Sequence, residues 1–395
     1  MDAVASMTLR ERCNFPMLDC QHYHQAINSA VERVIDSGHT ILAEGVRGFE
    51  ASFAAWLGGG LSAEHCLGVA NGTDALELAM RCAGVGSGEG VIVPTFTAYA
   101  TVAAILRIGA LPIFVDVEPG RAVLSPAEVE LRLAAKASFP RIRAVIAVHL
   151  YGEACDLHSL RELCSRHSLV LIEDCAQATG TIYEGTSIGT WGDFAAFSFY
   201  PTKNLAALGD GGMLVLGKQS NPSLLATARR MRLYGWNHQR EAVQFGANSR
   251  LDEVQAWILI GKLADLDDKI KARRSLANQY YQLISPWAGQ MGITLPEDGA
   301  NWSHSYHLYV ITVDPEKRPK ILARGASDGI PYTVHYPLAC HKHPYIAQQL
   351  GVLPLHLPQS ERLAASVLSL PLNPYLTGED IKTVSRHLHS LLAGV

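Results

Sequence analysis

The sequence predicts an α/β fold, in which a parallel sheet is wrapped by helices and a smaller α/β domain follows. The first observation is the alternation of apolar strand-like runs with amphipathic segments between residues 66 and 216, which is typical of strand–helix–strand units. The second is a buried strand-like run, 170–174, that ends in the carboxylates of Glu173 and Asp174. The third is a single lysine, Lys203, held between two further apolar runs. Polar groups at strand ends of such a sheet line the crevice where ligands bind.

The first elements are two helices and a strand–turn–helix unit. Apolar residues at helical spacing predict helices over 21–37 and 46–57, the second ended by three glycines. A short strand, 66–70, then runs through Asn71-Gly72-Thr73-Asp74 into a helix over 75–82. The N–H groups and dipole at such a helix start favour a bound phosphate. An ordinary capped helix explains the same residues when they are taken alone.

The middle of the chain continues the alternation toward Asp174. We expect strands over 90–94, 112–117 and 144–150 and helices over 97–106 and 157–167. Such connections favour parallel neighbours. The glycines at 84–88 resemble a dinucleotide fingerprint, but they follow a helix and precede a strand, which is the wrong order for that site.

The stretch around Lys203 is predicted to be a strand, a loop, a tight turn and a second strand. The first run ends at Ser198, Pro201 restricts the backbone before Lys203, and glycines at 209–212 form the turn. Between two buried strands the lysine loses solvation, so its pKa falls and its amine becomes nucleophilic. A surface lysine in a hairpin loop explains this stretch alone equally well. Together with Asp174, however, Lys203 forms the pair that pyridoxal phosphate (PLP) requires.

The last third is predicted to contain a second domain. Helical and strand-like spacings favour helices over 224–233, 251–263, 265–281, 360–368 and 378–392, and strands over 306–313 and 330–334. We expect a large domain over 1–265 and a small domain over 266–395. Two segments, His335-Tyr336-Pro337 and Cys340-His341-Lys342-His343, resemble a metal cluster. They lack a second set of ligands at zinc spacing, so we expect no metal.

Composition restricts the class of protein and its location. The chain has 395 residues, 48% hydrophobic and 18% charged, which suits a large globular core. A formal charge of −4 offers no basic surface, so we expect no nucleic-acid partner. The 8 cysteines lack C-x-x-C pairs, which favours reduced thiols. Glu11 and Arg12 lie where a signal peptide would be apolar, and no long uncharged apolar run follows, so we expect a cytoplasmic protein without membrane contact.

Four motifs in one order carry a family resemblance over nearly the whole chain. They are Asn71-Gly72-Thr73-Asp74-Ala75-Leu76, Glu173-Asp174-Cys175-Ala176-Gln177-Ala178, Ser198-Phe199-Tyr200-Pro201-Thr202-Lys203-Asn204 and Asn248-Ser249-Arg250-Leu251-Asp252-Glu253. With them the chain resembles the DegT/DnrJ family of sugar aminotransferases, which are PLP enzymes of the aspartate-aminotransferase fold, fold type I. The resemblance implies a mostly parallel, seven-stranded sheet in the large domain.

The resemblance also implies roles for individual residues. Lys203 would bind PLP as a Schiff base and move the proton, and Asp174 would hold the pyridine nitrogen. Gln177 would lie beside the ring hydroxyl. The phosphate would be held by Gly72, Thr73, Ser198 and the Asn248 of a neighbouring subunit, which implies a homodimer with shared sites. His335, Tyr336, His341 and His343 would border the substrate. Ala98 replaces the usual aromatic residue that stacks on the ring, so Tyr99, another side chain or a substrate group would cover it.

The implied reaction is amino transfer from glutamate to a keto-sugar linked to dTDP, UDP or GDP. The sequence leaves open whether C3 or C4 is aminated and whether a cyclitol replaces the sugar. One alternative is a PLP-dependent sugar dehydratase of the same fold, in which histidine replaces the lysine; Lys203 argues against it. The other is a catalytically silent regulatory or scaffold protein, against which Lys203, Asp174 and Gln177 argue.

Overall fold

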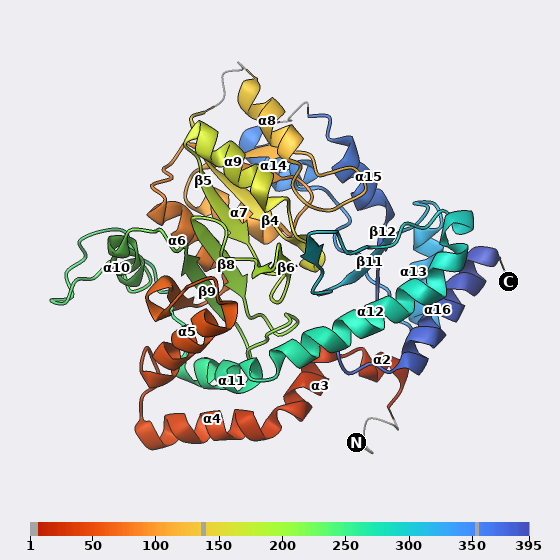
Figure 1. Cartoon of the computed structure of the whole chain (residues 1–395), viewed down its shortest axis with the longest axis horizontal. Helices are drawn as coiled ribbons and strands as arrows, with labels where there is room; N and C mark the ends of the chain where they lie inside the picture. Colours follow the sequence, from red (N-terminus) through yellow and green to blue (C-terminus); the bar gives the residue numbers. More distant parts are fainter. Residues whose placement is uncertain (1–6, 136–139, 352–354, 395) are drawn as a thin grey trace.

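The centre of the molecule is one seven-stranded sheet (Figure 1). The computed structural model describes residues 7–135, 140–351 and 355–394. The strands are β1 (Cys66–Val69), β2 (Gly90–Pro94), β3 (Leu111–Val115), β4 (Ile142–Val148), β5 (Val170–Asp174), β8 (Phe194–Ser198) and β9 (Gly212–Leu216). Their order is β1-β9-β8-β5-β4-β2-β3. Only β9 runs antiparallel to its neighbours in this sheet, so the predicted mostly parallel, seven-stranded sheet is confirmed.

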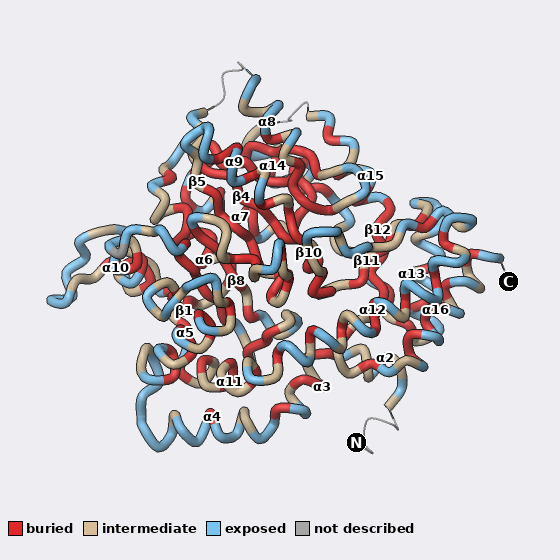
Figure 2. Tube along the Cα trace, in the orientation of Figure 1, coloured by how far each residue is buried: buried red, intermediate tan, exposed pale blue. Residues whose placement is uncertain are grey.

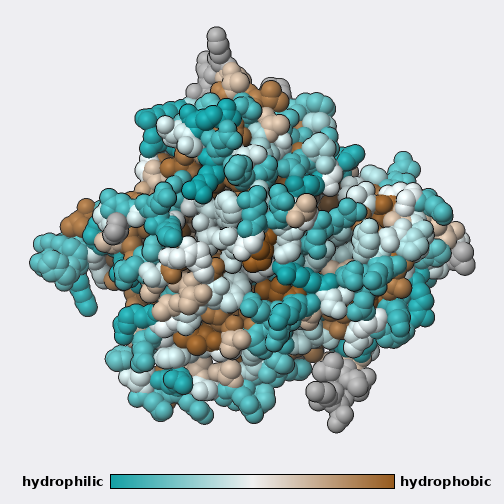
Figure 3. Space-filling view, viewed as in Figure 1, coloured by the Kyte–Doolittle hydropathy of each residue, from teal (hydrophilic) through white to brown (hydrophobic). Residues whose placement is uncertain are grey.

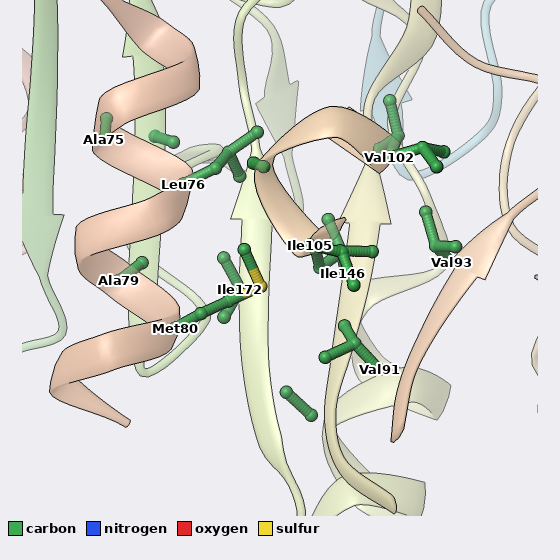
Figure 4. Close-up of a cluster of buried hydrophobic side chains, with 14 of the residues drawn as sticks. Ala75, Leu76, Ala79, Met80, Val91, Val93, Val102, Ile105, Ile146 and Ile172 are labelled. Atoms are coloured by element: carbon green, nitrogen blue, oxygen red, sulfur yellow. The ribbon is translucent and has the colours of Figure 1, made fainter. Parts of the chain in front are cut away.

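Helices cover both faces of this sheet, and the strands between them are buried (Figure 2). One face packs against α6 (Gly72–Cys82) and α7 (Tyr99–Arg107), and the other against α5 (Glu44–Leu57), α8 (Pro126–Ala134) and α9 (Leu157–His167). Figure 4 shows Leu76 and Met80 of α6 beside Ile172 of β5. Because side chains alternate along a strand, Asp174 lies on the same face as Ile172. The sheet therefore presents Asp174 at the carboxyl end of its central strand, on the side of α6 and α7.

The N-terminal helices lie below the sheet in Figure 1. They are α2 (Leu9–Arg12), α3 (Phe15–His22) and α4 (His24–Ser37). The helix predicted over 21–37 is confirmed over 24–37 as α4, but it does not begin at Gln21, because the chain leaves helical geometry at Tyr23 (φ −97°, ψ 16°). The hydroxyl of Tyr23 donates a hydrogen bond to Asp265 (2.6 Å), which holds this break against the start of the long helix α12.

The chain then adds α10 (Pro222–Met231) and α11 (Glu253–Leu263) before the 23-residue α12 (Leu266–Ala288). The final third contains α13 (Arg318–Ser327), α14 (Pro344–Leu350), α15 (Pro358–Ser366), α16 (Gly378–Ala393) and the antiparallel pair β11 (Tyr309–Thr312) and β12 (Val367–Leu370). A small sheet joins β10 (Trp302–Ser303), β6 (Ile182–Tyr183) and β7 (Thr186–Ser187). Helices α12, α13 and α16 and the pair β11–β12 enclose a core of their own. The boundary between 1–265 and 266–395 stays a prediction.

In the final third one predicted strand is wrong, and one predicted helix is confirmed as α15 but ends two residues early. The strand expected over 330–334 is reduced to a single bridge between Thr333 and Ser369, since Pro331 offers no N–H to a ladder. The helix expected over 360–368 ends at Ser366, and the next four residues form β12. The apolar residues Val367, Leu368 and Leu370 are buried there because β12 pairs with β11. Helical spacing in the local sequence could not reveal this pairing.

Two further expectations concern thiols and membranes. The 8 cysteines are all free in the structure, as predicted. In the described part of the chain, no helix has the length and apolar character needed to cross a bilayer. Residues 1–6, on which the expected absence of a signal peptide partly rests, lie outside the described residues.

Candidate active site

Two pockets meet at Lys203. The inner pocket, of about 250 Å³, lies at the carboxyl ends of β5 and β8 and is lined among others by Gly72, Thr73, Ala98, Thr101, Asp174, Gln177, Ser198, Tyr200 and Lys203. The outer pocket, of about 470 Å³, shares Gln177, Tyr200 and Lys203 with it and adds, among others, Arg273, His307, His335 and Tyr336. The structure therefore brings residues from distant parts of the sequence to one site.

The loop that carries Lys203 is held from both sides. The backbone N–H of Lys203 donates to Tyr200 (2.8 Å), and Ala207 donates to Phe199 (2.8 Å). Burial lowers the pKa of Lys203 to about 8, while Asp174 opposes this shift. Its Nζ finds no hydrogen-bond partner among the described residues. The predicted fall in the lysine pKa is confirmed, and the amine is available to a ligand.

Asp174 ends β5 and is 5% exposed. Its carboxylate accepts hydrogen bonds from Thr101 Oγ1 (2.8 Å) and from the backbone N–H of Ala176 (3.1 Å). Burial raises the pKa of Asp174, and these two hydrogen bonds oppose the rise. No described residue forms a salt bridge with this carboxylate, so a cation bound in the pocket would stabilise its charged form. Sequence reasoning missed Thr101, because only the tertiary fold places α7 beside β5.

The start of α6 faces the loop after β8. A Cβ at Gly72 would lie 2.8 Å from Cβ of Ser198, so only glycine allows the helix start this close to Ser198. The side chain of Asn71 caps the helix by accepting from the N–H of Asp74 (2.8 Å). Neither Gly72 nor Thr73 donates its N–H to a described residue, which leaves two donors and a helix dipole facing the inner pocket.

Gln177 joins the two pockets. Its Oε1 accepts from the N–H of Tyr151 (2.9 Å), and its Nε2 donates to the hydroxyl of Tyr336 (2.9 Å). Tyr151 in turn donates from its hydroxyl to the carbonyl of His335, whose ring bonds Oγ of Ser369 (2.8 Å). This network fixes His335 and Tyr336 in the wall of the outer pocket.

Three predicted site residues lie elsewhere. Asn248 is exposed and is not among the described residues that line either pocket. His341 is buried between Thr95 (2.7 Å) and Glu361 (3.2 Å). His343 packs its ring against Tyr99 at 5.0 Å. His341 and His343 also line neither pocket, and their predicted substrate contact stays a prediction.

The wall at Ala98 lacks a ring. Ala98 lines the inner pocket, whereas Tyr99 turns toward His343. Tyr200 is the only aromatic side chain among the described lining residues of the inner pocket, and it is 52% exposed. Tyr99 therefore does not take the place of the missing ring, and the space beside Ala98 remains open to a ligand.

A buried acid–imidazole–thiol group lies on the opposite face of β5. The ligand atoms of His149, Glu173 and Cys175 lie within 4.8 Å of one another. Glu173 already accepts from the N–H groups of Gly189, Trp191 and Gly192 and bonds the ring of His149. Because its acceptors are occupied, we assign this group to the support of β5, and the prediction of no metal remains a prediction.

The residues of the inner pocket fit PLP. The lysine amine, the buried carboxylate without a salt bridge and the two free N–H groups of α6 match the aldehyde, the ring nitrogen and the phosphate of this cofactor. The close approach at Gly72, where a Cβ would fill the cradle, leaves the room that a phosphate needs. The fold and this pocket define a PLP-dependent enzyme of the aspartate-aminotransferase fold.

The comparisons with known proteins lead to the family. The model of the DegT/DnrJ/EryC1/StrS aminotransferase family matches residues 21–389. The chain belongs to this family of PLP-dependent sugar aminotransferases.

Individual relatives cover almost the full length. The dTDP-3-amino-3,4,6-trideoxy-alpha-D-glucose transaminase of Streptomyces venezuelae is 40% identical, over 91% of this chain and 92% of its own. A protein of Geobacillus stearothermophilus named pleiotropic regulatory protein is 38% identical, over 93% and 95%. The crystal structure of DesV from S. venezuelae in complex with a ketimine intermediate has a TM-score of 0.88 at 37% identity, over 96% of this chain and 98% of that chain.

Proposed function

We propose that this enzyme transfers an amino group from glutamate to a nucleotide-linked keto-sugar. The observation that carries the proposal is the pairing of Lys203 with Asp174 across the inner pocket, beside an outer pocket large enough for a substrate. The S. venezuelae relative, by its name, acts on a dTDP-linked sugar aminated at C3. We therefore propose a dTDP-linked 3-keto-sugar as the first acceptor to test.

The chain's residues divide the work. Lys203 would hold PLP through Nζ, and Asp174 would keep the ring nitrogen in its protonated form. Gly72, Thr73 and Ser198 would hold the phosphate, and Gln177 would interact with the ring hydroxyl. When bound, PLP withdraws electrons from the carbon of the substrate that loses its proton. Nζ of Lys203 would accept that proton and pass it on, since the lowered pKa keeps part of the amine unprotonated near neutral pH.

The acceptor is tested with a panel of nucleotide keto-sugars. The purified enzyme, PLP and L-glutamate are incubated with 3-keto and 4-keto sugars carrying dTDP, UDP or GDP, and with a keto-cyclitol. Mass spectrometry should detect one amino product together with 2-oxoglutarate. An enzyme that consumes glutamate only with the cyclitol would contradict the nucleotide-sugar proposal.

Two alternatives make different predictions for the same protein. A sugar dehydratase would release water from the sugar without consuming glutamate, and Lys203 argues against it. A silent regulatory protein is the class that the name of the Geobacillus relative suggests. It would bind no PLP, so an absorbance scan of the purified protein separates it from an enzyme, which should be yellow.

The space beside Ala98 makes a first prediction. Ala98→Phe should tighten PLP by about 0.5–1.5 kcal/mol, because a ring would then stack on the cofactor. Titration of the apoenzyme with PLP measures this gain. Ala98→Leu is the control, since it fills space without a ring. Equal affinities for the phenylalanine and leucine variants would show that stacking does not take place there.

We further propose a homodimer in which Asn248 completes the phosphate site of the partner. Exposed apolar side chains, Ile35 on α4 and Val243 and Phe245 after α10, support a contact surface. In Figure 1 the green chain around α10 projects from the left edge of the molecule. On the face drawn in Figure 3, hydrophobic residues reach the surface at several places between hydrophilic ones. We also propose a cytoplasmic location, with no nucleic-acid or membrane partner.

A mixed dimer tests this assembly. One chain carries Lys203→Ala and the other Asn248→Ala, each being inactive or weak alone. In the hybrid, one site combines both lesions and the other keeps an intact Lys203 and an intact Asn248. The isolated hybrid should have about half of wild-type activity, as two-fold symmetry requires for independent sites. If hybrids form and activity stays absent, Asn248 acts within its own chain.

A further inference from the structure

The buried face of α12 contains one arginine among apolar residues. The face includes Leu266, Ile270, Ala277, Tyr280 and Ile284, spaced three, four or seven residues apart, and Arg273 occupies the position between Ile270 and Ala277. A charged side chain on such a stripe loses its hydration and requires compensation from its surroundings. Arg273 is 2% exposed, so this cost applies in full.

The surroundings compensate Arg273 only in part. Its Nη1 donates to the carbonyls of Tyr306 (3.3 Å), His307 (3.4 Å) and Leu372 (3.2 Å). Its Nε and Nη2 form no hydrogen bond with a described residue, and both atoms keep some exposure to solvent. No described carboxylate forms a salt bridge with this guanidinium. Two donors of one buried cation therefore remain free, and the outer pocket is the space that Arg273 lines.

His307 adds a donor beside this guanidinium. It is 6% exposed and lines the outer pocket. Its Nδ1 is buried without a hydrogen-bond partner, whereas its Nε2 keeps some exposure to solvent. Burying an N–H donor without a partner costs more free energy than burying an unused acceptor. We therefore assign the proton to Nε2, which faces the pocket, and leave Nδ1 unprotonated. Burial and the charges of Lys203 and Arg273 hold the pKa of His307 well below its usual value, which keeps the ring neutral.

The outer pocket has basic side chains and no acidic ones. It contains Lys203, Arg273, His307 and His335, and no aspartate or glutamate is among its described lining residues. An anion is the ligand that this lining lacks. Arg binds carboxylates through two parallel N–H groups, which are the two that Arg273 leaves free.

We propose that Arg273 and His307 bind a carboxylate of the amino donor beside Lys203. The inference rests on the proposed function and names the residues that recognise the donor. The free Nε and Nη2 of Arg273 form a two-pronged contact, and Nε2–H of His307 donates the third hydrogen bond. The carboxylate supplies the negative charge that the buried guanidinium lacks.

The reaction of the PLP-loaded enzyme with L-glutamate alone tests the proposal without any sugar. The change in cofactor absorbance gives an apparent Kd for glutamate and a limiting rate. Arg273→Met should raise that Kd by about 100-fold or more, because it removes the charge of a buried ion pair. His307→Leu should raise it by about 10-fold, the effect of one hydrogen bond to a charged group. Lys271→Met removes an exposed charge from the same helix and should leave the Kd unchanged.

L-Alanine distinguishes the two carboxylates of glutamate. It shares only the α-carboxylate, so loss with both donors assigns Arg273 to that group, and loss with glutamate alone assigns it to the distal one. Arg273→Met also removes three hydrogen bonds to carbonyls and risks misfolding. His307→Leu removes no side-chain hydrogen bond that the described structure contains. Its Kd for glutamate therefore tests the proposal if the arginine variant fails to bind PLP.

A wild-type Kd in a folded Arg273→Met protein, or in His307→Leu where the arginine variant misfolds, would overturn the proposal. So would a variant that reacts normally with glutamate but poorly with the keto-sugar, because Arg273 would then bind an anion of the acceptor. Failure of the proposed function gives a different result. The wild-type enzyme would then react with L-glutamate and aminate no keto-sugar.

Discussion

Lys203→Ala is expected to abolish turnover and to remove the visible absorbance of the resting enzyme. The lysine amine is the only group of the inner pocket placed to bond the cofactor, among the residues that the structure describes. It is also the base whose lowered pKa suits proton transfer near neutral pH. Removing it therefore eliminates the covalent bond and the proton carrier in one substitution.

The measurement is an absorbance spectrum followed by product analysis with glutamate and keto-sugar. Lys271→Ala is the control, because Lys271 is exposed and pairs only with Asp268. It should behave as wild type. Normal transamination by Lys203→Ala would mean that another lysine carries the reaction.

Asp174→Asn is expected to retain some PLP and to slow the reaction with glutamate by several orders of magnitude. Asparagine has nearly the same shape. Its amide oxygen can accept the hydrogen bond from the N–H of Ala176, and its amide nitrogen can donate to Oγ1 of Thr101 in the reverse direction. It carries no charge, so the ring nitrogen loses the carboxylate that keeps it protonated, and the electron-withdrawing power of the cofactor falls. Single-turnover absorbance changes with glutamate measure this rate.

Thr101→Val provides a graded comparison. It removes one hydrogen bond to Asp174 but keeps the charge, so its effect should stay within about 10–100-fold. A rate for Asp174→Asn close to that of the wild type would show that a different acid holds the ring.

Local patterns in the sequence were enough to predict the sheet and the pair Lys203 and Asp174. Each strand of the sheet is a short apolar run closed by turn residues. Asp174 is the last residue of one such strand, and Lys203 lies in the loop that follows another. The strand expected over 330–334 failed because pairing depends on a partner strand, which local spacing does not contain. The spacing of His341 and His343 in the sequence does not indicate where their side chains point. In the fold they contact Thr95 and Tyr99.

The missed residues depend on contacts between distant segments. Thr101 acts through Asp174, which lies 73 residues away in the sequence. Arg273 is visible as an exception in the sequence, because it occupies a position on the buried face of α12 where an apolar residue is expected. That position alone does not distinguish a binding arginine from one that tethers backbone carbonyls. The distinction came from the free Nε and Nη2 and from the acid-free lining of the outer pocket.

The central claim is that PLP is bonded to Lys203 in the inner pocket. Borohydride reduction of the yellow enzyme fixes that bond, and peptide mass spectrometry then locates it. The account predicts one pyridoxyl phosphate group per chain, on the peptide that contains Lys203. A modification on any other lysine, or an enzyme that takes up none, would contradict it.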